Sequence, residues 1–197
     1  MIKNKDDLQF YLQADKFSLN KTKKKPNIFS DEIWKFQICL RKYEYFCNST
    51  GFINRIMKIF YKLKFHRLGL KLGFSIPINV FEPGLSIAHY GNIVVNKNCK
   101  IGKNCRIHEG VTIGATGGSI KAPKIGNNVF IGTGAKIIGD IELGNGIVIG
   151  AGSVVVSSFK ENNITVAGVP AKKISNNDST SMCIRGYELA KNLKNYN

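Results

Sequence analysis

The chain has 197 residues and carries 29 Lys and Arg against 13 Asp and Glu, which gives a formal net charge of +16. A hydrophobic fraction of 43% excludes a wholly disordered chain, and no apolar run reaches the roughly 18 residues of a membrane span. The first residues lack the apolar core and small-residue cleavage site of a secretory signal, so none is expected. The isoelectric point near 9.7 favours an anionic partner such as nucleic acid, a lipid surface, a phosphorylated cofactor or an acidic polymer.

Residues 1–73 hold most of the charge, with 16 basic against 6 acidic residues, and are predicted to form a short helical region. A weak helix is expected from Asp6 to Ala14, followed by a basic linker at Lys21–Pro26, where the proline ends any helix. Ser30 is the expected N-cap of a second helix, because two acidic residues follow it in the first turn. A third helix is expected from about Phe52 to Leu68.

The third predicted helix is amphipathic and basic. Its apolar residues near one face are Ile53, Ile56, Met57, Phe60 and Leu63, and its other face carries Arg55, Lys58, Lys62 and Arg67. Such a helix can lie on an anionic membrane. More often the apolar face packs on its own domain, and this second interpretation is the one we favour.

A six-residue period runs through the middle of the chain. Aliphatic residues occupy positions 95, 101, 107 and 113, and then 125, 131, 137, 143, 149 and 155, so every step is six except one of twelve. Gly follows the aliphatic residue in most units. An earlier stretch keeps the same period in another phase, at Phe81, Ile87 and Ile93.

A period of six fits neither a helix nor a plain strand, but it fits a triangular coil in which each turn consists of three repeat units, each with one short strand. Residues 74–175 are therefore predicted to form a parallel β-helix whose aliphatic residues point inward, and 176–197 a C-terminal tail. The step of twelve marks a loop at Ala115–Lys124, and loops on rigid scaffolds commonly carry function.

Five cysteines occur, at positions 39, 47, 99, 105 and 183, and no pair has CxxC spacing. The odd number disfavours a disulfide scaffold, and the spacing disfavours a structural zinc site. Cys99 and Cys105 fall at inward positions of the repeat, so we expect them in the core. A reducing cytoplasm fits this usage best.

Four segments carry a resemblance to a known family: GLSIAHYG at 84–91, VTIGATGG at 111–118, VFIGTGAKIIGD at 129–140 and the stretch from 149 to 174 that ends in AGVPAKKI. The chain resembles the hexapeptide-repeat acyltransferases, and among them the serine O-acetyltransferases and their polysaccharide-modifying relatives. The resemblance covers about half of the chain. It implies a left-handed parallel β-helix, acetyl-CoA as co-substrate, no metal, and a homotrimer with the active site between neighbouring coils. The helical region would cap the open edge of the first coil.

Acyl transfer to a hydroxyl requires a base for the hydroxyl proton, and neutral imidazole suits this role near pH 7. The resemblance places the catalytic histidine of the family at His89. His108 is a second candidate near the acceptor, although corner packing would also explain it, and His66 is expected to be structural. Glu82 is the acid upstream of His89 that could orient its ring, or it is a plain corner residue.

The resemblance also assigns acetyl-CoA-binding residues. The backbone at Gly114 and Ala115 would stabilise the oxyanion, Thr133 and Ala151 would line the pantetheine slot, and Lys172 or Lys173 would meet the phosphates. The structural alternatives are a corner glycine at Gly114 and a solvated tail for the lysines.

Three positions depart from the serine-acetylating members of the family. Phe74 or Ser75 stands where an Asp is expected, Ala122 replaces a histidine in the extruded loop, and Ala88 replaces an acid before His89. These departures argue against serine as the acceptor. They favour acetylation of a sugar hydroxyl in a bacterial capsular or other surface polysaccharide, or in its precursor, and leave serine O-acetyltransferase of cysteine biosynthesis as the alternative.

The excess charge permits two further interpretations. It would guide an anionic carbohydrate acceptor to His89, or hold a cytoplasmic enzyme in peripheral contact with the inner face of the membrane. A protein that binds nucleic acid or lipid without catalysis is a third functional class, but no nucleic-acid motif accompanies the basic segments, so no nucleic-acid partner is expected.

Overall fold

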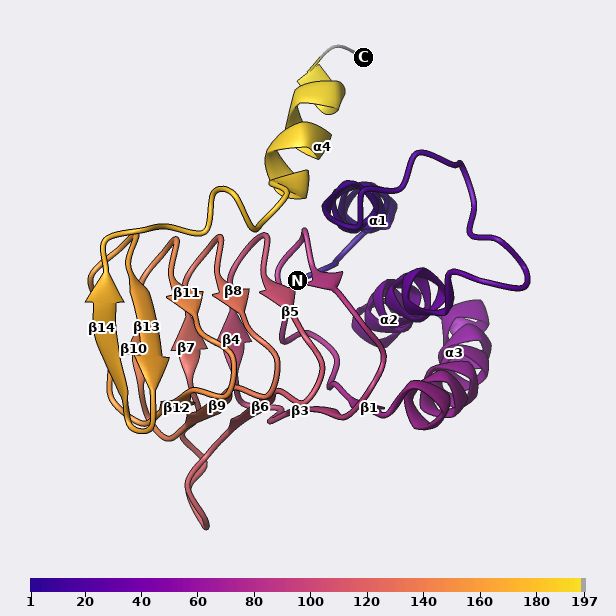
Figure 1. The fold of residues 1–197 in the computed structure, drawn as a ribbon. Helices are drawn as coiled ribbons and strands as arrows, with labels where there is room; N and C mark the ends of the chain where they lie inside the picture. Colours follow the sequence, from indigo (N-terminus) through magenta and orange to yellow (C-terminus); the bar gives the residue numbers. More distant parts are fainter. Residues whose placement is uncertain (196–197) are drawn as a thin grey trace.

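The computed structural model describes residues 1–195, which form a helical region followed by a β-coil (Figure 1). The helices are α1 (Lys5–Ser18), α2 (Glu32–Asn48) and α3 (Phe52–Leu72). Each predicted helix is present, and α1 and α3 extend beyond the predicted ends by about one turn. The prediction that Ser30 is the N-cap of α2 is wrong. Asp31 holds that position in a left-handed conformation with φ of 61°, and Lys21 and the Asn27 N–H bind its carboxylate.

The coil is built from short strands in three sheets. The five-stranded sheet contains β1 (Phe74–Ser75), β3 (Ile93–Val95), β6 (Thr112–Gly114), β9 (Lys136–Ile138) and β12 (Val154–Val155). The three-stranded sheet contains β4 (Lys100–Ile101), β7 (Lys124–Ile125) and β10 (Glu142–Leu143). The six-stranded sheet contains β2 (Ser86–Ile87), β5 (Arg106–Ile107), β8 (Phe130–Ile131), β11 (Val148–Ile149), β13 (Thr165–Gly168) and β14 (Ala171–Ser175).

Strand pairing follows the six-residue period. Pairing is parallel throughout except for the final β13–β14 hairpin, and partners such as Val95 and Ile113 are separated by three repeat units. Ile113 pairs with Ile137, which lies four repeat units further along the chain, because the loop between β6 and β7 adds one unit to that turn. This loop projects from the coil in Figure 1. The predicted parallel β-coil with an N-terminal helical region is thus confirmed.

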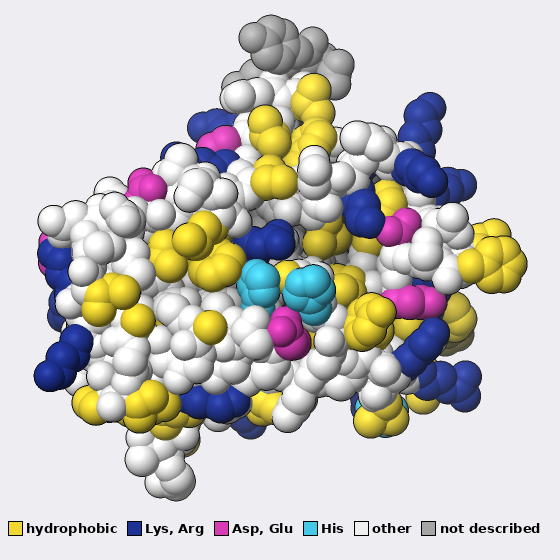
Figure 2. Space-filling view, viewed as in Figure 1, with side chains coloured by type: hydrophobic (Ala, Val, Ile, Leu, Met, Phe, Trp, Pro, Cys, Tyr) yellow, Lys and Arg dark blue, Asp and Glu magenta, His cyan; other side chains and the backbone are white. Residues whose placement is uncertain are grey.

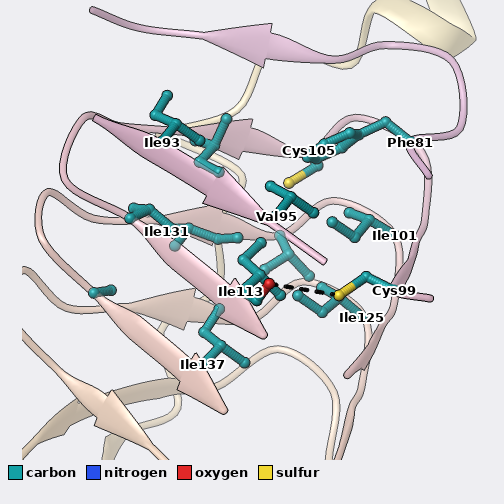
Figure 3. Close-up of a cluster of buried hydrophobic side chains, with 14 of the residues drawn as sticks. Phe81, Ile93, Val95, Cys99, Ile101, Cys105, Ile113, Ile125, Ile131 and Ile137 are labelled. Atoms are coloured by element: carbon teal, nitrogen blue, oxygen red, sulfur yellow. Dashed lines mark hydrogen bonds between the residues drawn. The ribbon is translucent and has the colours of Figure 1, made fainter. Parts of the chain in front are cut away.

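The aliphatic residues of the repeat fill the coil interior, as Figure 3 shows for Ile93, Ile113, Ile131 and Ile137. Cys99 and Cys105 are buried there as predicted, and all five cysteines are free. Burial raises the pKa of the Cys99 thiol to about 11, so it stays protonated and acts as a small apolar side chain.

Polar side chains of α1 and α2 cap the first turn of the coil. Asp15 accepts hydrogen bonds from the N–H groups of Gly84 and Leu85, and the Gln37 amide donates to the Leu85 carbonyl. Arg41 is fully buried and donates to the carbonyls of Phe81 and Glu82. Backbone groups that would otherwise form an exposed sheet edge are thereby satisfied, and the predicted capping role of the helices is confirmed.

The C-terminal tail contains an unpredicted helix, α4 (Gly186–Asn195), which packs on α1. The ring of Tyr187 meets Phe10 edge to face at 5.3 Å. A Cβ atom at Gly186 would lie 2.2 Å from the Ala14 carbonyl oxygen, so only glycine allows this approach. Among residues 1–195, no helix combines the length and hydropathy needed to cross a membrane.

Candidate active site

His89 lies at a corner of the first turn, just after β2. Ile87 points into the core, and the Ala88 N–H donates to the Ile107 carbonyl, so the backbone stays in register with the next turn up to the corner. Gly91, with φ of 140°, turns the chain towards β3. The His89 side chain consequently points outward and is exposed, as a base that must reach a bound acceptor requires.

Parallel register aligns the corner residues of successive turns. The strands β2, β5, β8 and β11 pair in register. Two residues after the last paired residue of each strand come His89, Glu109, Thr133 and Ala151, which therefore lie in one column along the coil. We call these residues the corner column. Thr133 Oγ1 donates to Glu109 Oε1 at 3.1 Å, which supports the alignment.

Glu109 is the carboxylate beside His89, and the sequence analysis missed it. Potential ligand atoms of His89, His108 and Glu109 all lie within 4.8 Å of one another. Figure 2 shows two adjacent histidines with an acidic side chain beside them near the middle of one face. The signal was present in the sequence, because Ile87 and Ile107 are equivalent positions in successive turns, and the interval between them also leads from His89 to Glu109.

The electrostatics of this cluster favour an ionised Glu109 and a neutral His108. The backbone N–H of Glu109, then Thr133 and the two histidines, lower the pKa of the Glu109 carboxyl below its usual range. Burial is the main reason why the pKa of His108 is lowered, and Arg106 adds to it. Within the described residues, His108 Nε2 and Glu109 Oε2 are buried without a hydrogen-bond partner, so the cluster retains one free acceptor or donor position on each side chain.

His108 lies next to His89 and not in a separate corner. The two ring centroids are 5.7 Å apart, and the other neighbour of His108 is the ring of Phe130 at 5.0 Å. His89, His108 and Glu109 are also the group that could hold a metal ion, as two imidazoles and a carboxylate are common ligands.

Glu82 has partners other than His89. Its Oε2 accepts a 2.7 Å hydrogen bond from the Tyr11 hydroxyl, and Oε1 lies 3.6 Å from the N-terminal amine. These contacts tie α1 to the first turn of the coil. Glu82 is therefore part of the contact between the helical cap and the coil, and the carboxylate close to His89 is that of Glu109.

A pocket of about 520 Å³ opens beside the histidine cluster, between the segment that leads into α2 and the six-stranded sheet. Its wall includes Ala88, Tyr90 and Arg106 from the coil, and Asp31 and Trp34 from the helical region. Arg106 Nη1 donates to Ser86 Oγ at 3.0 Å, which positions the guanidinium at the pocket wall. The pocket wall thus carries Arg106 and Lys21 together with the acidic Asp31 and Glu32, next to the segment that holds His89.

The acetyl-CoA-binding candidates are spread over the coil. Thr133 and Ala151 lie exposed in the corner column. Lys172 and Lys173 lie on β14, five strands and about 24 Å from β2 in the same sheet. Gly114 ends β6, about 10 Å along the strand direction from the corner, so one chain does not bring Gly114 and Ala115 to His89. Ala122, near the end of the extruded loop, is buried and faces the core.

Comparison with known proteins supports one family. The family described as bacterial transferase hexapeptide (six repeats) matches residues 122–157. Serine acetyltransferases of Staphylococcus xylosus and Staphylococcus aureus are 44% identical over 59 residues and 37% identical over 91 residues. These matches span 29% and 45% of this chain but only 27% and 38% of the relatives, so the chain aligns with well under half of their length.

Serine acetyltransferase from Brucella abortus strain S19 has a similar structure, with 30% identity and a TM-score of 0.64 over 89% of this chain and 70% of that one. The chain belongs to the hexapeptide-repeat acyltransferases. A second structure of the Brucella enzyme, in complex with coenzyme A, matches with 29% identity and a TM-score of 0.62 over 89% of this chain and 69% of that one.

These matches correct the expected acceptor. The interpretation of this hexapeptide-repeat acyltransferase as a capsular polysaccharide acetyltransferase with a carbohydrate acceptor is wrong, because the relatives found by sequence and by structure are serine acetyltransferases. The absence of charged residues at positions 88 and 122 misled the sequence analysis. Arg106, a cation at the wall of the adjacent pocket, lies outside those family positions.

Proposed function

We propose that the protein is an acetyl-CoA-dependent serine O-acetyltransferase. The exposed His89 beside the Glu109 carboxylate carries this proposal. The serine hydroxyl attacks the thioester carbonyl of acetyl-CoA directly, while His89 accepts the hydroxyl proton. A new C–O bond forms, the C–S bond breaks, and the proton passes from His89 to the departing thiolate, which leaves as coenzyme A thiol.

Glu109 acts through His89 in this proposal. Its ionised carboxylate stabilises the imidazolium that forms during proton transfer, in the manner of the acid in a catalytic triad. Thr133 binds one carboxylate oxygen through its hydroxyl, and the other, Oε2, lies 3.9 Å from Nδ1 of His108. The neutral His108 packs against His89 and restricts where its ring can lie. No step uses a metal ion.

Serine would bind in the pocket beside the cluster. Arg106 lies at the pocket wall and would pair with the serine carboxylate, a role suited to the forked donors of a guanidinium. Asp31 also lines this pocket, but its carboxylate is paired with Lys21 and is not free to bind the serine ammonium. Arg106 thus supplies a charge for the acceptor that Ala88 and Ala122 do not.

Acetyl-CoA would extend along the corner column towards the β13–β14 hairpin. The exposed side chains of Thr133 and Ala151 are small enough for a pantetheine chain to pass, and Lys172 and Lys173 lie where the column ends. Gly114 and Ala115 would then come from a neighbouring copy and complete the site across an interface. The proposal therefore includes a homotrimer of left-handed coils in the cytoplasm, where five free cysteines remain reduced.

The test is release of coenzyme A thiol from acetyl-CoA in the presence of L-serine. His89→Ala is expected to lower kcat by about 100- to 10,000-fold, the range that a positioned acid–base group contributes. His66→Ala is the matched control, because His66 is exposed on α3 and is expected to leave turnover unchanged.

The acceptor assignment has its own readout in the same assay. Arg106→Gln is expected to raise KM for serine while KM for acetyl-CoA stays unchanged. Thiol release that does not depend on serine, or full activity of His89→Ala, would refute the proposed function.

A further inference from the structure

Helix α3 has two apolar faces, and only one of them is covered. The inner face contacts α2, where Phe65 stacks on Phe36 at 5.2 Å and Tyr61 stacks on Phe46 at 5.2 Å. The apolar residues of the outer face are Phe52, Ile56, Ile59, Phe60, Leu63 and Leu70. They recur at helical spacing, so they form one stripe along the helix opposite its contact with α2.

The side chains of this outer stripe are largely in contact with solvent. Phe52 is 78% exposed and Leu70 is 71% exposed, at opposite ends of the helix. The prediction that the apolar residues of this helix pack on its own domain therefore fails for most of them. The stripe is unbroken from Phe52 to Leu63, and Arg67 lies within it between Leu63 and Leu70. An exposed apolar stripe of this length marks a contact surface.

Positive charge borders the stripe on both sides. In a helix of 3.6 residues per turn, Arg55, Lys58 and Lys62 fall along one edge, and Lys64 and Lys71 fall along the other. Helix α3 contains six Lys and Arg and no acidic residue. An apolar stripe between two cationic edges is the arrangement of helices that lie in the plane of an anionic lipid surface.

A second apolar group adjoins the C-terminal end of α3. Lys71 contacts Glu32 at 3.3 Å, Glu32 contacts Lys35 at 3.5 Å, and Lys35 Nζ donates to the Ile28 carbonyl at 2.6 Å. Ile28 and Phe29 are 81% and 94% exposed at the end of the basic segment that begins at Lys21. This chain of contacts places two more unpartnered apolar side chains beside the basic end of α3.

We propose that the outer face of α3, with Ile28 and Phe29, binds the surface of an anionic lipid bilayer. The apolar side chains would enter the boundary between head groups and acyl chains, and the flanking lysines and arginines would pair with lipid phosphates. The positive charge of α3 favours an anionic bilayer over a second copy of the chain as the partner of this face. Two copies that met through this face would bring the six positive charges of one α3 against the six of the other. In Figure 1, α3 lies at the end of the molecule away from the β13–β14 hairpin, so the bilayer would meet the helical end.

The test is co-sedimentation of the full chain with two kinds of vesicles, phosphatidylcholine alone and phosphatidylcholine mixed with phosphatidylglycerol. Binding is expected only to the vesicles that contain phosphatidylglycerol, and high salt is expected to release it. Ile59→Ser combined with Leu63→Ser is expected to abolish binding. Lys58→Gln combined with Lys62→Gln is expected to lower the partition coefficient by about fivefold per charge.

Two controls test whether vesicle binding requires this surface, or whether any exposed apolar residue or any lysine contributes equally. Ile120→Ser removes an apolar residue of the extruded loop that is even more exposed than Ile59 and Leu63, and Lys97→Gln removes a charge from the coil. Neither is expected to change vesicle binding, and circular dichroism checks that every variant keeps the wild-type helix content. Because serine acetylation occurs in the coil, the α3 variants are expected to keep full turnover in lipid-free solution.

Two results would overturn the proposal. One is wild-type protein that stays in the supernatant with phosphatidylglycerol vesicles at low salt. The other is a smaller assembly in analytical ultracentrifugation when Ile59 and Leu63 are replaced by serine, because the face would then be an interface between copies.

Discussion

The coil and the helical region place their apolar residues by different rules. In the coil, a single repeat fixes the inward positions, and residues such as Ile107, Ile131 and Ile149 are fully buried. In the helical region one fully buried cluster is ionic, formed by Arg41, Asp15 and Glu44, while much of α3 exposes apolar side chains. In the coil, the position of a residue within the repeat determines whether it is buried, whereas the burial of a helix face depends on which neighbouring element covers it.

The largest expected effect comes from breaking the ionic cluster of the cap. Arg41→Leu leaves Asp15 and Glu44 buried without their cation, and removing one partner of such a cluster costs about 3–5 kcal/mol. Thermal or urea unfolding measures the loss. Arg55→Leu, on the exposed side of α3, is the matched control and is expected to stay within about 0.5 kcal/mol.

The same variant has a predictable pH dependence. Burial, as the largest cause, already raises the pKa of Glu44 above its usual range, and loss of Arg41 would raise it further. A carboxyl whose folded pKa is raised stabilises the fold at low pH and loses this effect as pH rises through the folded pKa. The deficit of Arg41→Leu is therefore expected to shrink on acidification, and a pH-independent deficit would argue against buried carboxylates as its source.

A smaller effect, on kcat, is expected when Glu109 beside the candidate base His89 is replaced. Glu109→Gln removes the charge that stabilises the His89 imidazolium, and kcat is expected to fall by about 100-fold. The acid limb of the kcat/KM profile should move to lower pH, which a purely structural role would not produce. Glu109→Asp should restore part of the activity, and Glu142→Gln, at an exposed carboxylate of another sheet, should leave the profile unchanged.

The contrast between the coil and the helical region explains how much of each could be predicted from the sequence. The period of six predicts the strands, the inward cysteines and the extruded loop, because each depends only on position within the repeat. It does not directly pair His89 with Glu109, because the first turn is longer than three full repeat units. The helix at Gly186–Asn195 has a clear amphipathic pattern that the prediction of a plain tail overlooked, whereas its contact with α1 depends on the close approach at Gly186. Likewise, the amphipathic pattern of α3 indicates a helix but does not tell which stripe is covered.

The smallest effect tests the contrast most directly. Leu63→Ala removes an apolar side chain of the same size class as Ile131→Ala, yet Leu63 is 57% exposed and Ile131 is fully buried. Cavity formation and lost burial predict a cost of about 2–5 kcal/mol at Ile131. At Leu63 neither term applies and alanine favours the helix, so a change within about 0.5 kcal/mol is expected in urea unfolding of the lipid-free protein. A cost at Leu63 approaching that at Ile131 would mean that the outer face of α3 is already buried in solution, and the difference between the two regions would then lie in the assembly rather than in the single chain.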